Sequence, residues 1–209
     1  MDNAKLYKPQ KMKYFLVIDQ GTSSTRAILF DEKFAVVNLS QTEFKQFFPK
    51  DGWVEHDANE IFDTVIDCIK DVMTKSKITY KEIIAIGITN QRETCLLWDK
   101  QGNPLSKAIV WQDRRTAELC NNFKRDGLDI KINQITGLLA DPYFSGTKLS
   151  WLLDNTGTPK DFYMGTIDTF LVWKLTDGRS YFIDATNASR TLLMDINNLS
   201  WSEEMCNLL

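Results

Sequence analysis

The fold class of the 209-residue chain is indicated most clearly by residues 14–30, which read YFLVIDQGTSSTRAILF. The apolar, β-branched run at 14–18 predicts a buried strand, and the polar residues after it predict a tight turn. Apolar character resumes at 26–30 and again at 34–40. The sequence therefore predicts three short strands in an antiparallel meander, opened by a polar loop that contains Gly21.

Helix and strand signals alternate along the rest of the chain. Asp57, with Glu60 three residues later, predicts a helix N-terminus, and apolar residues follow at helical spacing to Met73. Strands followed by alternating helices and strands indicate an α/β or mixed sheet covered by helices. We further expect a buried strand at 83–89, strands at 95–98 and 109–111, a turn at 141–143 and a turn-and-strand region at 181–195. One helix is expected to start at an Asp113 cap and run to about Lys124, and another to start at a Ser145 cap and run to Leu153. Residues 167–175 form either a buried helix or a buried strand, and Thr166 or Asp168 as a cap favours the helix.

Composition excludes several classes of partner. The chain has 25 basic and 28 acidic residues, so its formal net charge is −3. This balance argues against nucleic acid or an anionic membrane surface as the main partner, although it leaves room for a small phosphate site. No stretch approaches the roughly 20 apolar residues that span a bilayer, and no signal peptide precedes the first strand. We therefore predict a cytoplasmic protein with no membrane span.

The cysteine and histidine content agrees with that location. Cys68, Cys95, Cys120 and Cys206 are widely spaced and do not form a Cys-x-x-Cys motif, so we expect reduced thiols. His56 is the only histidine, which excludes a histidine-rich metal site. We expect it in a turn or loop.

A first cluster of polar residues follows the first strand. Glycine permits a bend with outward N–H groups, three hydroxyls add donors, and an arginine adds a fork that meets phosphate oxygens. An aspartate at a strand end suits Mg²⁺ held through water. The alternative is an ordinary hairpin turn, in which the same residue types are common. The residues concerned are Asp19, Gly21, Thr22, Ser23, Ser24 and Arg26.

A second polar cluster, at 89–94, follows the strand expected at 83–88. Open α/β sheets bind ligands just beyond the carboxyl ends of their strands. Arg92 donates hydrogen bonds and Glu93 accepts them, so together they suit the adjacent hydroxyls of a polyol. The alternative is a solvated loop with a local ion pair that contributes little.

Two aromatic residues complete the set of candidates. Trp111 and Tyr143 offer flat apolar surfaces against which the C–H faces of a polyol pack. The alternative is that both belong to the core, as aromatic residues at strand ends usually do.

Five segments, taken in order, resemble the carbohydrate kinase (FGGY) family, and the resemblance runs from about Tyr14 to the end of the chain. It implies a ribonuclease-H-like fold of the actin-like ATPase superfamily, an α/β protein with a mixed sheet flanked by helices. The strings Asn-Gln-Arg-Glu-Thr and Ala-Asp-Pro-Tyr-Phe-Ser favour glycerol over other sugars. The segments are Phe15–Arg26, Gly87–Thr94, Ile109–Thr116, Gly137–Lys148 and Asp184–Thr191.

The resemblance implies an activity and a role for each candidate. The implied activity is transfer of the γ-phosphoryl group of ATP, with Mg²⁺, to glycerol, which gives glycerol 3-phosphate. By resemblance, Thr22, Ser23 and Ser24 form the nucleotide phosphate loop, with Arg26 as its nearby arginine and Asp19 as the metal-associated aspartate, while Arg92, Glu93, Trp111 and Tyr143 bind glycerol.

The resemblance also implies a domain organisation. We expect residues 1–12 to be an N-terminal extension and 13–209 to be the N-terminal, substrate-side domain, with the second domain absent. The family's base, an aspartate in a Gly-Asp-Gln context, would lie beyond Leu209, so no catalytic residue is assigned. We therefore expect weak or no activity from the chain alone, and a homo-oligomer or a complementing C-terminal half as its partner.

Other functions remain open at this point. The chain would be a non-catalytic polyol-binding remnant if it holds a polyol without turnover. It would be a related kinase if another sugar or polyol is its substrate. An actin-like structural ATPase is a further alternative, against which the Arg92 and Glu93 pocket argues.

Overall fold

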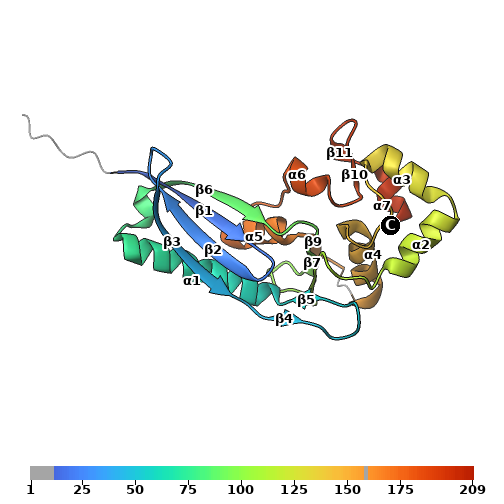
Figure 1. The fold of residues 1–209 in the computed structure, drawn as a ribbon, viewed down its shortest axis with the longest axis horizontal. Helices are drawn as coiled ribbons and strands as arrows, with labels where there is room; N and C mark the ends of the chain where they lie inside the picture. The colour runs from blue at the N-terminus through green and yellow to red at the C-terminus, as the bar shows by residue number, and fades with distance from the viewer. Residues whose placement is uncertain (1–11, 158–159) are drawn as a thin grey trace, which may run out of the picture.

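A four-stranded sheet forms one end of the elongated molecule, for which a computed structural model describes residues 12–157 and 160–209 (Figure 1). The expected extension at 1–12 therefore lies outside the described residues, except for Met12. The strand order is β3-β2-β1-β6, with β1 antiparallel to β2, β2 antiparallel to β3, and β6 parallel to β1. The predicted meander is confirmed. The strands are β1 (Tyr14–Gln20), β2 (Ser24–Phe30), β3 (Val36–Glu43) and β6 (Ile83–Asn90).

The parallel pairing of β1 and β6 places the two polar clusters together. Its register aligns Gln20 with Asn90, the last residue of each strand. Because parallel strands end at the same edge of a sheet, the residues that follow them lie side by side. The topology therefore brings together the cluster that the resemblance assigns to the nucleotide and the cluster that it assigns to glycerol.

A second sheet, of five short strands in the order β4-β5-β8-β7-β9, lies beside the first. It places His56 in β5, fully buried, and the expectation of a turn or loop for this residue is wrong. A separate hairpin is formed by β10 and β11. The bounds are β4 (Gln46–Phe47), β5 (Glu55–His56), β7 (Cys95–Trp98), β8 (Ala108–Ile109), β9 (Tyr163–Thr166), β10 (Met194–Asp195) and β11 (Ser200–Trp201).

The helices cover one face of the four-stranded sheet and build the opposite end of the molecule, where α2, α3 and α7 gather (Figure 1). None of the described helices is both long enough and apolar enough to cross a bilayer. All four cysteine thiols are free, as expected. The helices are α1 (Ala58–Ser76), the short 3₁₀ helix η1 (Tyr80–Glu82), α2 (Ala117–Arg125), α3 (Leu128–Thr136), α4 (Ser145–Asn155), α5 (Ile167–Leu175), α6 (Ala185–Ala188) and α7 (Glu203–Leu208).

Helix α1 confirms the amphipathic helix that the sequence predicts after Asp57. Ile61, Val65 and Val72 are fully buried, and α1 packs on β2 and β3. Each such side chain stabilises the fold by about 1.5–3 kcal/mol. The helix ends at Ser76, and the next residue, Lys77, has a left-handed backbone (φ 55°) and donates its N–H to carbonyls of the last turn.

The start of α1 gives a first prediction, because Asp57 accepts hydrogen bonds from the backbone N–H groups of Asn59 and Glu60. Substituting D57A is expected to lower the free energy of unfolding by about 1 kcal/mol, the usual cost of a lost N-cap. D57N keeps a capping oxygen and loses only the ion pair with Lys107, so its loss should be smaller. Urea unfolding of both variants checks this, and equal losses would show that the ion pair matters and the cap does not.

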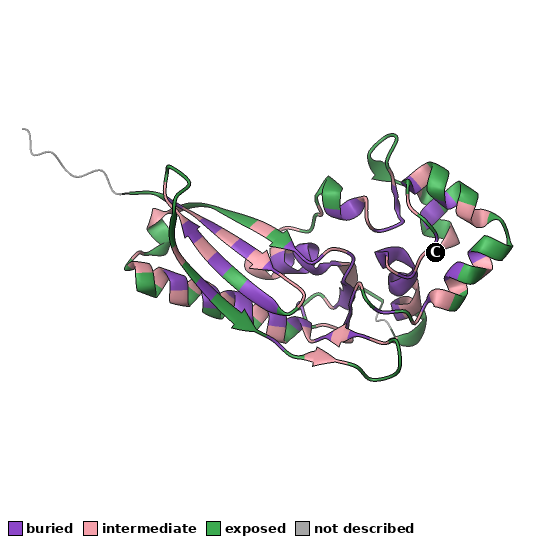
Figure 2. Ribbon diagram, in the orientation of Figure 1, coloured by how far each residue is buried: buried purple, intermediate pink, exposed green. Residues whose placement is uncertain are grey.

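The structure corrects several sequence expectations. The strand expected at 83–89 exists, but it is largely exposed, because β6 lies at an edge of the sheet (Figure 2). Asp113 does not cap α2, which begins after Thr116, and Ser145 lies inside α4, which begins after Phe144. Helix α3 was not expected, and the region at 181–195 contains α6 as well as a strand.

Candidate functional site

The loops that follow β1 and β6 are joined by direct hydrogen bonds. The Gln91 backbone N–H donates to the Gln20 carbonyl at 2.7 Å. Its side-chain amide donates to Gln20 Oε1 at 3.1 Å and to the Gly21 carbonyl at 3.2 Å. The hairpin after β1, which is the candidate phosphate-binding turn, and the loop after β6, which carries Arg92 and Glu93, are therefore one structural unit.

The hairpin itself is a tight turn between β1 and β2. The Gly21 N–H donates to the Ser24 carbonyl at 2.9 Å. Ser23 is exposed at the tip, whereas the buried Ser24 hydroxyl accepts a hydrogen bond from the Gln41 amide at 3.2 Å. Thr22 Oγ1 accepts from the Trp111 indole at 3.0 Å. The hydroxyls therefore differ in how open they are to a ligand.

Asp19 and Arg26 face each other across β1 and β2, where their register pairs them. Arg26 Nη1 lies 3.0 Å from Asp19 Oδ2, and its Nε donates to Gln41 Oε1 at 2.9 Å. Both charged side chains are partly exposed, 47 % for Arg26 and 32 % for Asp19. The pair is thus held beside the hairpin and remains accessible from solvent.

Trp111 joins the hairpin to the aromatic part of the site. Its ring centroid lies 5.6 Å from that of Tyr143, with the planes tilted by 60°. Both residues are only partly buried. This exposure favours the interpretation of a ligand-facing wall over that of core residues.

The two charged residues of the second cluster do not form a pair with each other. Arg92 Nη1 points back to the Asn90 carbonyl, 3.4 Å away. Glu93 is buried, and its Oε1 accepts from Arg190 Nε at 2.6 Å. Glu93 also has a left-handed backbone, with φ 63°, which turns its side chain away from that of its neighbour. Arg92 and Glu93 therefore do not form the local ion pair of the alternative interpretation, and their binding of a polyol stays a prediction.

Arg190 is a site residue that the sequence did not reveal. It follows α6, and its guanidinium carbon lies 5.6 Å from the ring centroid of Tyr143. It thus contacts two of the four residues proposed to bind a polyol. The segment Asp184–Thr191 carried the family resemblance, but its pattern gave no reason to assign a role to this arginine.

Lys148 is a second residue that the sequence did not reveal. It is fully buried in α4, and its Nζ donates to the carbonyls of Pro142, Tyr143 and Phe144 at 3.1, 2.5 and 3.0 Å. Burial lowers the pKa of Lys148 to about 8. The three bonds hold the turn that carries Tyr143.

His56 supports the site from behind without facing it. Its Nδ1 lies 3.3 Å from the Gln91 amide nitrogen, and its ring packs edge-on against Phe44. Burial lowers the pKa of His56 to about 4, so the ring is neutral at pH 7. A neutral imidazole at this place accepts a hydrogen bond from Gln91 and helps to fix the loop.

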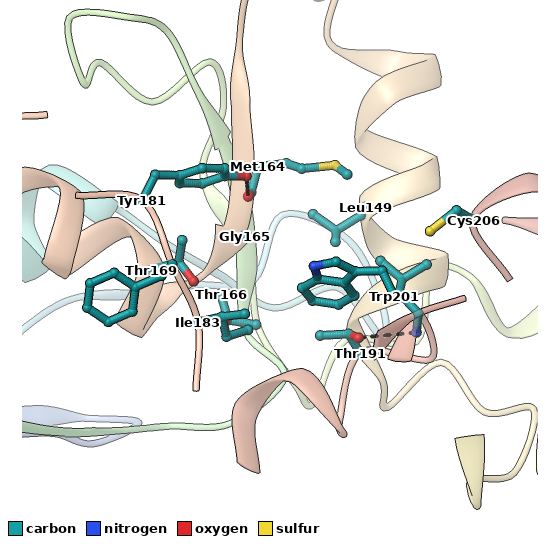
Figure 3. Close-up of a pocket in the computed structure, with 12 residues that line it drawn as sticks. Leu149, Met164, Gly165, Thr166, Thr169, Tyr181, Ile183, Thr191, Trp201 and Cys206 are labelled. Carbon is teal, nitrogen blue, oxygen red and sulfur yellow. Dashed lines mark hydrogen bonds between the residues drawn. The ribbon is translucent and has the colours of Figure 1, made fainter. Parts of the chain in front are cut away.

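A cavity of about 560 Å³ is lined by none of these residues (Figure 3). Its wall is mainly apolar and includes Leu149, Met164, Tyr181, Trp201 and Cys206, and it holds no Asp, Glu, Lys or Arg side chain. Such a wall offers no charged partner to a phosphate. We therefore place the candidate site at the β1 and β6 loops, not in this cavity.

The mixed sheet flanked by helices confirms the expected α/β class. Solved structures of sugar and polyol kinases share this fold, which is the ribonuclease-H-like fold of the actin-like ATPase superfamily. Residues 14–209 match the family model described as the FGGY family of carbohydrate kinases, N-terminal domain. The chain belongs to this family, and the resemblance drawn from its motifs is confirmed.

Individual relatives sharpen the comparison. A glycerol kinase from Sinorhizobium fredii is 54 % identical over 94 % of this chain, and one from a Geobacillus species is 50 % identical over the same share. The crystal structure of Plasmodium falciparum glycerol kinase with ADP matches 94 % of this chain with a TM-score of 0.87 and 40 % identity. A gluconate kinase from Lactobacillus acidophilus, at 24 % identity and a TM-score of 0.84 over 94 % of this chain and 39 % of its own, supports the fold alone. The chain spans 41 % of the two curated relatives and 40 % of the Plasmodium structure.

Proposed function

We propose that the chain is the substrate-side part of a kinase that transfers the γ-phosphoryl group of ATP to glycerol and forms glycerol 3-phosphate. The observation that carries this proposal is an unbroken line of contacts. It runs from Thr22 in the hairpin through Trp111, Tyr143 and Arg190 to Glu93. A phosphate-type turn and a polyol-type pocket thus share one site, and the high identity to glycerol kinases favours glycerol as the polyol.

In this proposal the polyol is held by complementary groups. Glu93 accepts a hydrogen bond from one hydroxyl through the carboxylate oxygen that is not bound to Arg190. Arg92, which is partly buried, donates to a neighbouring oxygen. Trp111 and Tyr143 pack against the C–H groups. Each contact uses a different property of the same small molecule, which favours a ligand with adjacent hydroxyls.

The hairpin supplies the nucleotide side of the proposed site. Thr22, Ser23 and Ser24 would contribute N–H and O–H donors to the phosphates of ATP, and Arg26 would add positive charge. Asp19 fits a role toward Mg²⁺, because its side chain is partly exposed and only its Oδ2 is bonded to Arg26.

Asp19 would hold Mg²⁺ beside the hairpin, and the metal would supply positive charge that offsets the charge developing on the phosphates. Within the described part of the chain, no group of three or more His, Cys, Asp or Glu side chains is placed to hold a metal ion. The phosphates and ordered water would therefore supply most of its ligands, which suits the hydration that Mg²⁺ retains.

Turnover requires more than this site. Phosphoryl transfer needs a base for the substrate hydroxyl and closure of the protein around both substrates. We propose that residues 13–209 form the substrate-side domain and that the base comes from another domain. Detectable turnover then needs the further residues that the longer relatives possess. We also predict that the chain associates with a complementing half or with copies of itself.

Calorimetric titration of the chain with glycerol, with and without ATP and Mg²⁺, tests the proposal. The wild-type chain is expected to bind glycerol, and E93Q to bind it about tenfold to a hundredfold more weakly, since a hydrogen bond to a charged group contributes about 1.5–3 kcal/mol. E118Q, an exposed change on α2, is the matched control and should bind as the wild type does.

Further titrations and an assay separate the alternatives. Tighter binding of a pentose or pentitol would indicate a related sugar or polyol kinase. Glycerol binding with no turnover, even beside a complementing half, would indicate a polyol-binding remnant. Equal binding by E93Q and wild type would overturn the assigned site. A coupled assay that detects ATP-dependent glycerol phosphorylation by this chain alone would refute the need for a second domain.

A further inference from the structure

Glu93 is a buried carboxylate whose charge is balanced from a distant part of the chain. Its side chain is 2 % exposed, and the Arg190 guanidinium, 97 residues away in sequence, lies 2.6 Å from it. We infer that Arg190 is a positioning residue, which holds the Glu93 carboxylate and the Tyr143 ring in the arrangement that a polyol needs. This inference rests on the proposed function and adds to it a residue that is not itself proposed to bind the polyol.

The charge balance explains why Arg190 is needed. A carboxylate that is buried without a partner is strongly destabilising, whereas a guanidinium bonded to it offsets the lost hydration. Arg92 does not provide this balance, because its Nη1 turns to the Asn90 carbonyl. Arg190 is therefore the cation that pairs directly with the Glu93 carboxylate, while buried Lys148 adds a second positive charge that is not bonded to it.

The backbone of Glu93 is constrained as well. A φ of 63° is uncommon for a residue other than glycine and persists only where neighbouring contacts enforce it. The Ser145 hydroxyl donates to the Glu93 carbonyl at 3.1 Å, and the Thr94 N–H donates to the Arg92 carbonyl at 2.7 Å. The side chain is thus fixed at its base by these bonds and at its tip by Arg190.

Arg190 is itself held firmly against the polyol-type loop. Its backbone N–H donates to the Asn187 carbonyl at 3.0 Å. The side-chain amides of Asn187 and Asn90 exchange hydrogen bonds of 3.0 and 3.1 Å. Asn90 directly precedes the loop that carries Arg92 and Glu93. The segment after α6 is therefore tied to that loop by hydrogen bonds, which fix the position of Arg190 relative to Glu93.

The same segment packs closely on α4, which follows the Tyr143 turn. The Gly146 N–H donates to the Thr191 carbonyl at 2.7 Å, and a Cβ at Gly146 would lie 2.6 Å from that oxygen. Only glycine permits this approach. It brings the Arg190 guanidinium over the rings of Tyr143 and Phe144, with carbon-to-centroid distances of 5.6 and 4.9 Å. One arginine therefore contacts both the acidic and the aromatic part of the pocket.

The test combines four variants of the pair with a control. R190M removes the charge, R190K keeps a charge without the planar fork, and E93Q and the double variant E93Q/R190M complete a double-mutant cycle. R125M, on exposed α2, is the control. Urea midpoints, glycerol affinity and the NMR signals of the Glu93 side-chain carboxyl carbon and the Trp111 indole N–H are measured for each.

The expected pattern separates positioning from general damage. R190M should lower the urea midpoint clearly in the wild-type background and by less than half as much in the E93Q background. It should weaken glycerol binding about tenfold and shift both NMR signals, while R190K should recover most of the affinity. R125M should change none of these quantities.

Two results would overturn the inference. One is an R190M variant with the midpoint, NMR signals and affinity of R125M, and the other is an equal loss in both backgrounds of the cycle. If the wild type itself does not bind glycerol, the proposed function fails. The cycle and the NMR signals then still decide whether Arg190 positions Glu93 and the aromatic wall.

Discussion

Replacing Asp113 by alanine is expected to lower the free energy of unfolding by about 3–5 kcal/mol, the usual cost of breaking a buried ion pair from one side. Asp113 is fully buried, and the Arg115 side chain beside it is 2 % exposed. Asp113 accepts three hydrogen bonds from Arg115, of 2.8 to 2.9 Å, and one from the Val54 N–H at 2.7 Å. D113A would remove both acceptor oxygens and so break all four hydrogen bonds at once.

The surroundings of Arg115 make relaxation difficult. Its guanidinium carbon lies 3.7 Å from the ring centroid of Trp53 and 4.6 Å from that of Trp151. Glu55 Oε1, at 2.8 Å, is the other carboxylate oxygen paired with it. Without Asp113, one carboxylate must compensate a cation enclosed by two indole rings, and the Val54 N–H loses its acceptor.

Urea unfolding at pH 7 measures this loss, with R114M as the matched control. Arg114 is the neighbouring residue, but its side chain is 52 % exposed and its partner is the partly exposed Asp141. Exposed ion pairs contribute about 0–1 kcal/mol, so R114M should change stability little. A D113A variant as stable as R114M would show that the buried network does not stabilise the fold.

The behaviour of Asp113 also shows where sequence reasoning stops. Asp113 precedes an amphipathic segment, as an N-cap residue does, and this pattern correctly predicts that its side chain accepts hydrogen bonds. The donors come instead from Arg115 and from Val54, which is 59 residues away. The local sequence pattern therefore identifies Asp113 as an acceptor, but the tertiary structure determines which groups donate to it.

The elements that were predicted correctly depend on local signals. The meander follows from apolar runs separated by turn residues, and α1 follows from a cap and a long apolar stripe. Helix α6 has only four residues, so periodicity could not reveal it. The exposure of β6 could not be predicted either, because an apolar run does not report whether its strand lies at the centre or the edge of a sheet.

The structure brings several of the candidate residues together, but their contacts with one another did not follow from the sequence. Thr22, Trp111 and Tyr143 lie together as one site requires. Arg92 and Glu93 were expected to act together on a polyol, but the Glu93 side chain, which has a left-handed backbone, is bonded to Arg190, 97 residues along the chain. Charge balance in a buried site is a property of the tertiary structure, and a single sequence does not contain the distances that decide it.

Replacing Lys148 by methionine is expected to lower the free energy of unfolding by about 2–3 kcal/mol at pH 7, because three buried carbonyls lose their donor. Methionine keeps most of the volume, so the loss does not reflect a cavity. The same change should loosen the turn that holds Tyr143 and weaken glycerol binding. K131M, an exposed change on α3, serves as the control.

The loss in K148M should also grow with pH, which distinguishes a buried ammonium from a merely well-packed side chain. The pKa of Lys148 is about 8 in the folded protein and 10.5 in the unfolded chain. Between these values the unfolded chain binds more protons, so the wild type gains stability as pH rises, and K148M lacks this gain. The difference between the two should widen by about 2 kcal/mol from pH 7 to pH 9.5, given about 1.4 kcal/mol for each pKa unit. A difference that stays constant over this range in urea unfolding, while K131M follows the wild type, would contradict the buried-charge interpretation of Lys148.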